Sequence, residues 1–190
     1  MKTQSLAAAL LVMLLTVGLP ATAQADEGGW FIGGGPVRYT LDFNVERPEG
    51  RSTGTDRETG GEIRLGWRGP RHRFHGGFGT FSADDYRLQV GTLNADVLYP
   101  VRNYFKVLAG GSLVLARQNW DSGAIDDDTS AGLGFQIGVL LPLGRHVDLE
   151  LAYRQLFTRL RTDVPANGDG DIRYNAERIG STHLHINIRF

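Results

Sequence analysis

The sequence predicts an all-β fold: an eight-stranded antiparallel up-and-down transmembrane β-barrel that follows an N-terminal signal peptide. Three observations lead to this fold class. Apolar residues recur at every second position through eight segments, long and short connections alternate between the segments, and aromatic residues gather near the segment ends. An even number of strands is also what a single-chain barrel of this kind requires.

The first 25 residues have the three parts of a secretory signal peptide. Lys2 precedes an apolar run over residues 6–19, and Ala23-Gln24-Ala25 supplies small residues at the cleavage site. The run is too short for a helical anchor, which needs about 20 apolar residues. We therefore expect residues 1–25 to be removed during export and residues 26–190 to form one barrel domain.

The eight predicted strands each have one apolar face. In chain order, the residues that define these faces are Phe31, Gly33, Gly35, Val37, Tyr39, Leu41 and Phe43; Ile63, Leu65 and Trp67; Phe74, Gly76, Phe78 and Thr80; Tyr86, Leu88, Val90, Leu93, Ala95, Val97 and Tyr99; Phe105, Val107, Ala109, Gly111, Leu113 and Leu115; Leu133, Phe135, Ile137, Val139 and Leu141; Val147, Leu149, Leu151 and Tyr153; and Leu184, Ile186, Ile188 and Phe190. In the fourth segment the spacing slips by one at Gly91-Thr92, which predicts a β-bulge.

The connections also favour a membrane barrel. Long connections are predicted over residues 44–60, 119–130 and 159–177, with a shorter one at 82–85, and tight turns join the other strands. Long loops on the outer side and short turns on the other side are typical of transmembrane barrels. A soluble barrel would show the same alternation, but it would not need aromatic rings near both ends of the strands.

The composition of the 190-residue chain excludes several classes of partner and site. Lys and Arg number 20 against 21 Asp and Glu, so the net charge of −1 gives no reason to expect nucleic acid. The absence of Cys excludes disulfides, Cys-based zinc sites and Cys nucleophiles. The mean hydropathy of −0.21 resembles that of a soluble protein only because it averages an apolar face with a polar one.

Several segments resemble a known family, the small eight-stranded outer-membrane β-barrels of Gram-negative bacteria (the OmpA transmembrane domain, OmpX and opacity-type proteins). The segments that carry the resemblance are the signal peptide and residues 28–35, 96–100, 148–154 and 184–190. The resemblance implies that the protein lies in the cell outer membrane, in contact with its lipid. It also implies that the terminal Phe190 is an assembly signal read by the barrel-insertion machinery.

The residues between the apolar ones are predicted to face the barrel interior and to pair there as a polar lumen network, because an unpaired buried charge is costly. The charged residues that this parity places inside are Arg38, Asp42, Glu62, Arg64, Arg73, Arg87, Asp96, Lys106, Asp148, Glu150, Arg154 and Arg189. Such a network either plugs the barrel or leaves a narrow path for water and small ions. A wide pore is not expected, since it needs about 16 strands.

Three groups of residues resemble catalytic or metal-binding sites, but each lacks a feature that such a site needs. Ser181 and His183 are spaced like a lipid deacylase pair, but in reversed order and on the polar parity. The pairs His72/His75 and His183/His185 lack a third metal ligand, and residues 167–171 lack the later ligands of a calcium loop. We therefore expect no catalytic, cofactor or metal site.

The expected function is that of a non-enzymatic structural or adhesion-type protein. Its extracellular partner would contact residues 44–60, 119–130 and 159–177, because loops on a rigid scaffold commonly carry recognition. The alternatives are a narrow solute or ion channel and a lipid A deacylase-like enzyme.

Overall fold

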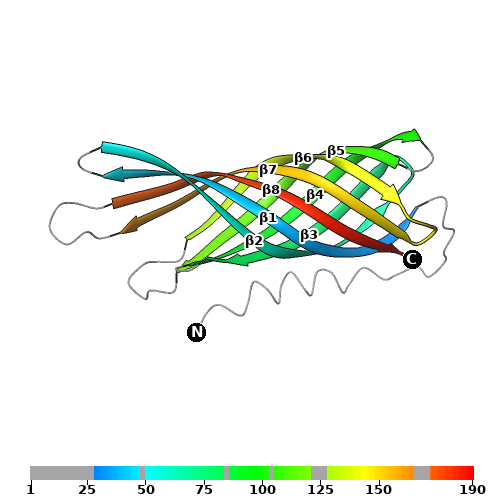
Figure 1. The fold of residues 1–190 in the computed structure, drawn as a ribbon, viewed down its shortest axis with the longest axis horizontal. Coiled ribbons are helices and arrows are strands. Elements are labelled where there is room, and N and C mark those ends of the chain that lie inside the picture. The colour runs from blue at the N-terminus through cyan, green and yellow to red at the C-terminus, as the bar shows by residue number, and fades with distance from the viewer. Residues whose placement is uncertain (1–27, 48–49, 84–85, 103–104, 121–127, 165–171) are drawn as a thin grey trace.

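The computed structural model describes residues 28–47, 50–83, 86–102, 105–120, 128–164 and 172–190. The predicted signal peptide lies outside these residues. The strands are β1 (Gly29–Arg47), β2 (Gly50–Arg68), β3 (His72–Ser82), β4 (Tyr86–Arg102), β5 (Phe105–Trp120), β6 (Asp128–Pro142), β7 (Val147–Val164) and β8 (Ile172–Arg189). Each strand pairs with the next in antiparallel fashion, and β1 pairs with β8, so the sheet closes into a barrel (Figure 1). This confirms the predicted fold class.

The two ends of the barrel differ. The end that we call the short-turn rim carries the connections after β2, β4 and β6, together with Gly29 and Phe190. The opposite end, the hairpin rim, carries the connections after β1, β3, β5 and β7. Within the described part of the chain, no helix is long and apolar enough to cross a membrane.

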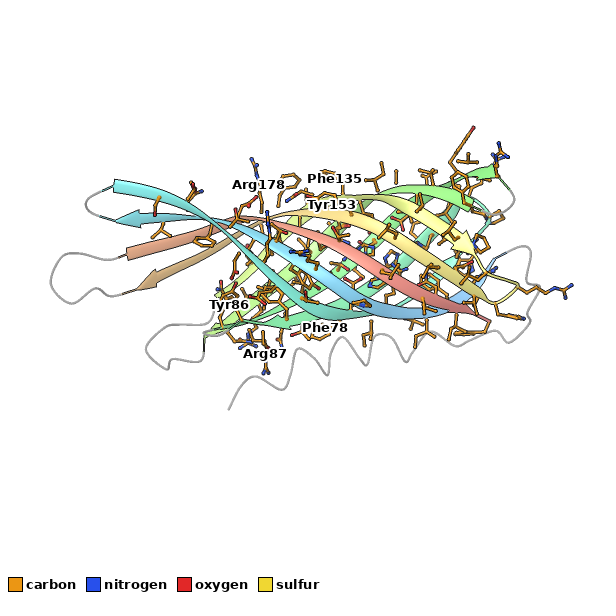
Figure 2. The ribbon with its side chains drawn as sticks, viewed as in Figure 1. Phe78, Tyr86, Arg87, Phe135, Tyr153 and Arg178 are labelled. Carbon is orange, nitrogen blue, oxygen red and sulfur yellow. The ribbon has the colours of Figure 1, made fainter. Side chains whose placement is uncertain are left out.

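The outer wall is apolar because alternate residues of each strand point away from the interior. Exposed large hydrophobic side chains occur on all eight strands, and Figure 2 shows Phe78, Phe135 and Tyr153 among them. The apolar residues predicted for the second, third, fifth, sixth, seventh and eighth strands lie on this face. A continuous band of exposed apolar side chains matches the hydrocarbon layer of a bilayer, not water.

The barrel interior has two layers. The apolar layer lies toward the hairpin rim and consists of Val37, Tyr39, Leu41, Phe81, Leu88, Val90, Val114, Ala116, Leu156 and Ile179. The polar layer lies toward the short-turn rim and consists of Glu62, Arg64, Arg68, Arg73, His75, Asp96, Gln136, Asp148, Glu150, Arg154, His183, His185 and Asn187. Beside it, Leu98, Leu108, Leu140 and Ala152 form a small apolar cluster.

The apolar layer explains two errors of the sequence prediction. β4 pairs with β3 and β5 without a register shift at Gly91-Thr92, so the predicted bulge is wrong. The apolar positions change parity because Leu88 and Val90 fill the interior whereas Leu93 faces outward. The apolar residues of β1, which were predicted to face lipid, likewise point into the interior.

At the hairpin rim, four strands extend further than the others. β1, β2, β7 and β8 contain 19, 19, 18 and 18 residues, against 11 in β3. Among the described residues, the part of β2 before Gly61 has no ladder to β3. On its other side, the β1–β2 ladder continues to Arg47↔Gly50, and the β1–β8 ladder continues to Glu46↔Arg173. Figure 1 shows the two hairpins projecting from the barrel at the left. We call residues 41–47, 50–60, 158–164 and 172–178 the protruding sheet.

The protruding sheet corrects the predicted connections. Most of residues 44–60 are strand, as are the outer parts of 119–130 and 159–177. Residues 50–60 read as a loop because they contain no large apolar residue and so lack the alternation that marks a strand. Ile172, Tyr174 and Ala176 do alternate with polar residues, and the sequence prediction overlooked this pattern. The pairing of each hairpin with its neighbour supplies the regular structure instead.

Candidate functional site

The polar layer is centred on Glu150, an inward residue of β7 with a fully buried side chain. The guanidinium of Arg64 on β2 donates two hydrogen bonds to it, Nη1 to Oε1 at 2.9 Å and Nη2 to Oε2 at 2.6 Å. Arg73 on β3 also pairs with Glu150. One carboxylate is thus held by two guanidinium groups from across the barrel, and charge-assisted bidentate contacts of this kind are strong and directional.

A second pair lies beside the first. Arg154 on β7 donates to both oxygens of Glu62 on β2, at 2.9 and 3.2 Å. Its Nε also donates to Oε1 of Gln136 at 3.2 Å, and the Gln136 amide donates to Asp96. Asp96 in turn accepts from Arg73, Nε to Oδ2 at 2.8 Å. The two pairs are therefore links of one connected network.

A further group of polar contacts lies at the short-turn rim. Asp148 pairs with Arg68 and with Arg189, whose Nε lies 3.0 Å from Oδ2. Arg189 also donates to the carbonyl oxygen of Gly144 at 2.9 Å. Lys106 is half-buried, and its ammonium group donates to the carbonyl oxygen of Pro70 at 3.4 Å. These contacts tie strand ends from opposite sides of the rim.

The fully buried charges balance. Among the described residues, the buried ionised groups are four arginines (Arg64, Arg68, Arg73 and Arg154) and four carboxylates (Glu62, Asp96, Asp148 and Glu150). Each of them has an opposite charge within ion-pair distance. Because desolvating an ion is expensive, this balance is what allows eight charges to occupy a narrow interior.

The sequence matches a family model described as the outer membrane protein β-barrel domain, over residues 7–180. The chain belongs to this family. The short-turn rim of this outer-membrane barrel accordingly faces the periplasm and the hairpin rim faces the cell exterior. The predicted resemblance and the predicted location in the cell outer membrane are both confirmed.

Solved structures agree on the fold. The outer-membrane barrel is similar to outer membrane protein OprG from Pseudomonas aeruginosa, with 12% identity, a TM-score of 0.65, and coverage of 89% of this chain and 99% of that one. It is also similar to Neisserial surface protein A, with 19% identity, a TM-score of 0.55, and coverage of 85% and 97%. Outer membrane protein H from P. aeruginosa has 20% identity, a TM-score of 0.56, and coverage of 85% and 99%. No curated protein matches this chain in sequence.

The structure places the predicted lumen residues as follows. Glu62, Arg64, Arg73, Asp96, Asp148, Glu150 and Arg154 are buried in the polar layer of this outer-membrane barrel, and Lys106 and Arg189 lie half-buried at its short-turn rim. Sequence reasoning missed Arg68, because it was assigned to a turn. His75 was considered only as a metal ligand, although the parity of its strand also places it inside.

Three predicted lumen residues lie elsewhere. The side chains of Arg38, Asp42 and Arg87 are exposed on the outer surface of this barrel. Asp42 accepts a hydrogen bond from Thr55 at 3.1 Å, and Arg87 donates to Ser82 at 3.3 Å. Their predicted position was wrong because the interior near the hairpin rim is apolar, so the polar residues of β1 and β4 point outward at that level.

Of the residues considered for chemistry, His75, Ser181, His183 and His185 face the interior of the barrel, whereas His72 is exposed at the short-turn rim. Ser181 and His183 are buried in the lumen, away from the lipid-facing wall. The rings of His183 and His185 stack at a centroid distance of 4.6 Å, and Nε2 of His183 lies 3.4 Å from Oε1 of Glu150. Nδ1 of His75 lies 3.6 Å from Oδ2 of Asp96. Among the described residues, no group of three His, Cys, Asp or Glu side chains is arranged to hold a metal ion. Residues 167–171, considered above as a calcium loop, lie outside the described residues.

Proposed function

We propose that this outer-membrane barrel is a non-enzymatic surface protein that presents its protruding sheet to an extended polypeptide segment of a partner. The observation that carries the proposal is the open edge of β2. Residues 50–60 pair with β1 on one side, and among the described residues no strand pairs with them on the other. An unpaired edge offers a row of N–H and C=O groups that a further strand can satisfy.

The side chains of this edge define the chemistry of the partner. Thr55, Arg57 and Thr59 are exposed on one face of the edge, whereas Asp56 and Glu58 lie half-buried on the other. Asp56 already accepts hydrogen bonds from the Tyr86 hydroxyl and from the Arg57 amide, both at 2.8 Å. A basic residue of the partner segment would therefore pair with Glu58. Threonine also favours the extended conformation that strand addition requires.

The side chains that occupy the interior support a role outside the lumen. The balanced network fills the half near the short-turn rim, and the apolar layer fills the half near the hairpin rim. The burial of Ser181 and His183 inside the wall argues against a deacylase, because such an enzyme must reach lipid.

The test is a selection of linear peptides on the barrel in lipid nanodiscs, followed by hydrogen–deuterium exchange of the complex. We expect selected peptides to protect the amides of residues 50–60. Binding should fall at least tenfold in a variant in which Asn-Gly replaces residues 42–55, since Leu41 and Asp56 face each other in the ladder and a two-residue turn can join them.

The matched control shortens the other hairpin, with Asn-Gly replacing residues 161–175 between the paired Leu160 and Ala176. This control should bind the peptides as the native barrel does. Peptides that leave the β2 amides unprotected, or that bind the two shortened variants equally, would contradict the proposal.

A further inference from the structure

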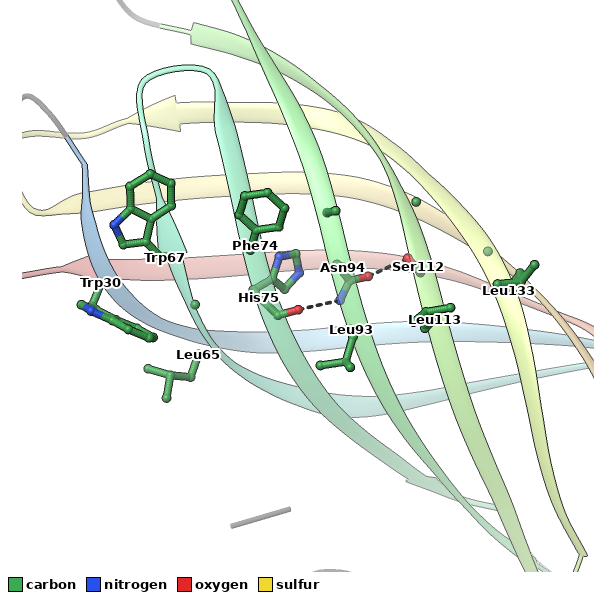
Figure 3. Close-up of a pocket in the computed structure, with 14 residues that line it drawn as sticks. Trp30, Leu65, Trp67, Phe74, His75, Leu93, Asn94, Ser112, Leu113 and Leu133 are labelled. Atoms are coloured by element: carbon green, nitrogen blue, oxygen red, sulfur yellow. Dashed lines mark hydrogen bonds between the residues drawn. The ribbon is translucent and has the colours of Figure 1, made fainter. Parts of the chain in front are cut away.

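The lipid-facing wall of the barrel contains a shallow groove over β2 to β6, with a volume of about 720 Å³ (Figure 3). Its floor includes Ala95 and Gly111, which are direct partners in the β4–β5 ladder. Phe74 and Phe135 follow on either side, as the partners of Ala95 on β3 and of Gly111 on β6. Two small residues between two aromatic ones leave a depression in an otherwise bulky wall.

Steric crowding does not explain why residue 111, in the floor of the groove, is a glycine. A Cβ atom added at Gly111 would meet nothing closer than the carbonyl oxygen of Gly134, at 3.9 Å. Its neighbour Gly110, in contrast, faces inward, where a Cβ atom would collide with Asp96. A strand glycine without a steric reason costs conformational entropy and gives up side-chain packing. What Gly111 preserves is room on the lipid side.

A basic rim borders the groove at its periplasmic end. Arg71 and Arg102 are exposed. The amide of Leu98 on β4 donates to the carbonyl oxygen of Arg71 at 2.8 Å, and Arg102 lies four residues further along the same strand. These two cations therefore lie on adjoining stretches of the short-turn rim.

The same stretch of rim is free of exposed negative charge. In the described residues of the turns after β2 and β4 and the strand ends beside them, Asp96 is the one carboxylate, and it is buried. Trp67 lines the groove and Tyr99 is 70% exposed at this level. Tryptophan and tyrosine on a membrane protein lie at the headgroup layer, so the basic rim stands where lipid phosphates lie.

We propose that the groove and its basic rim bind an anionic glycerophospholipid of the periplasmic leaflet. One acyl chain lies over Ala95 and Gly111, between Phe74 and Leu113. The phosphate contacts the guanidinium groups of Arg71 and Arg102, which suit phosphate oxygens in charge and geometry. A bare apolar groove selects no headgroup, whereas this one joins an acyl-sized depression to cations at headgroup depth.

Native mass spectrometry of the barrel, released from micelles doped with phosphatidylglycerol or phosphatidylcholine, tests the proposal. The native barrel should retain phosphatidylglycerol at least fivefold better than phosphatidylcholine. Gly111→Leu, which fills the groove, should reduce retention of both lipids several-fold. The double variant Arg71→Gln/Arg102→Gln should abolish the preference between headgroups while leaving phosphatidylcholine retention unchanged.

Matched controls separate the site from its surroundings. Ala131→Leu adds the same side chain at an exposed position of β6 outside the groove, and Arg38→Gln/Arg178→Gln removes two exposed arginines near the opposite rim. Both should retain lipid as the native barrel does, and all variants should keep the heat-modifiable gel shift of a folded barrel. Equal retention of the two lipids by the native barrel would overturn the proposal. So would a dimer that Gly111→Leu dissociates, since the groove would then hold a second copy.

Discussion

At the scale of single residues, the barrel interior depends on ion pairs, in which each buried charge needs a partner from another strand. Glu62 lies on β2 and Arg154 on β7, 92 positions apart in sequence, yet they form a bidentate pair in the lumen. Such a pair adds little net stability over apolar residues of the same volume, but losing one partner leaves a bare charge in a medium of low polarity.

This asymmetry predicts the behaviour of variants at the pair. Arg154→Met should lower the free energy of unfolding by about 3–5 kcal/mol, because it leaves Glu62 ionised and buried. The double variant Arg154→Met/Glu62→Gln should recover most of that loss. Urea unfolding in lipid vesicles measures both. If the double variant is as unstable as Arg154→Met alone, the pairing does not explain the cost.

Glycines in the wall have different roles that a stability measurement can separate. A Cβ atom added at Gly132 would collide with the backbone carbonyl oxygen of Phe157, whereas Gly111 has open space. Gly132→Ala should therefore cost about 1–3 kcal/mol through overpacking. Gly111→Ala should leave stability unchanged or raised. Urea unfolding in lipid vesicles measures the free energy of unfolding of both variants. Equal effects of the two substitutions would contradict this steric explanation.

At the scale of elements, the last strand closes the barrel. β8 pairs with both β7 and β1, and the amide of Phe190 donates to the carbonyl oxygen of Trp30 at 3.0 Å. The ring of Phe190 is exposed beside the first strand. Closure therefore ends at the residue that the family resemblance marks as an assembly signal.

Deletion of Phe190 should accordingly reduce the amount of heat-modifiable barrel in the outer membrane of cells several-fold. Phe157→Ala removes another exposed aromatic ring, on β7, and serves as the control, because it leaves the terminal strand intact. Gel mobility of unheated membrane fractions measures both. An equal loss from the two changes would show that Phe190 contributes only as one more lipid-facing ring.

At the scale of the whole molecule, the lumen combines a polar half with an apolar half. The polar half contains the buried hydroxyl of Ser181 and the ring nitrogens of His185, which have no hydrogen-bond partner among the described residues, and buried polar atoms of this kind are commonly satisfied by internal water. The apolar layer stands between that region and the cell exterior. We therefore expect the apolar layer to hinder the passage of water and ions through the barrel.

Planar-bilayer recording tests this closure directly. We expect no reproducible conductance steps from the native barrel, because the apolar layer occupies the interior near the hairpin rim and the charges below it are paired. Steps that disappear in a Glu62→Gln or Arg64→Gln variant would instead support the channel alternative. Heat modifiability of the same preparation confirms that the inserted protein is folded.

The sequence by itself determined the strand number, the connection pattern and the lipid-facing side of most strands, because alternation reports which residues meet an apolar solvent. It placed Glu150 and Arg154 inside for the same reason. It could not place Arg38 or Asp42, since alternation cannot tell an apolar face turned toward lipid from one turned toward an apolar layer within the barrel.

Only the tertiary structure decided which charges pair, that residues 44–60 continue as strand, and that Ala95 and Gly111 make a groove. Each of these depends on which strands become neighbours when β8 meets β1. The partners of Glu150 come from β2 and β3, on the opposite side of the barrel from β7. Closure of the sheet brings these partners together. Their spacing along the chain does not indicate that they become neighbours.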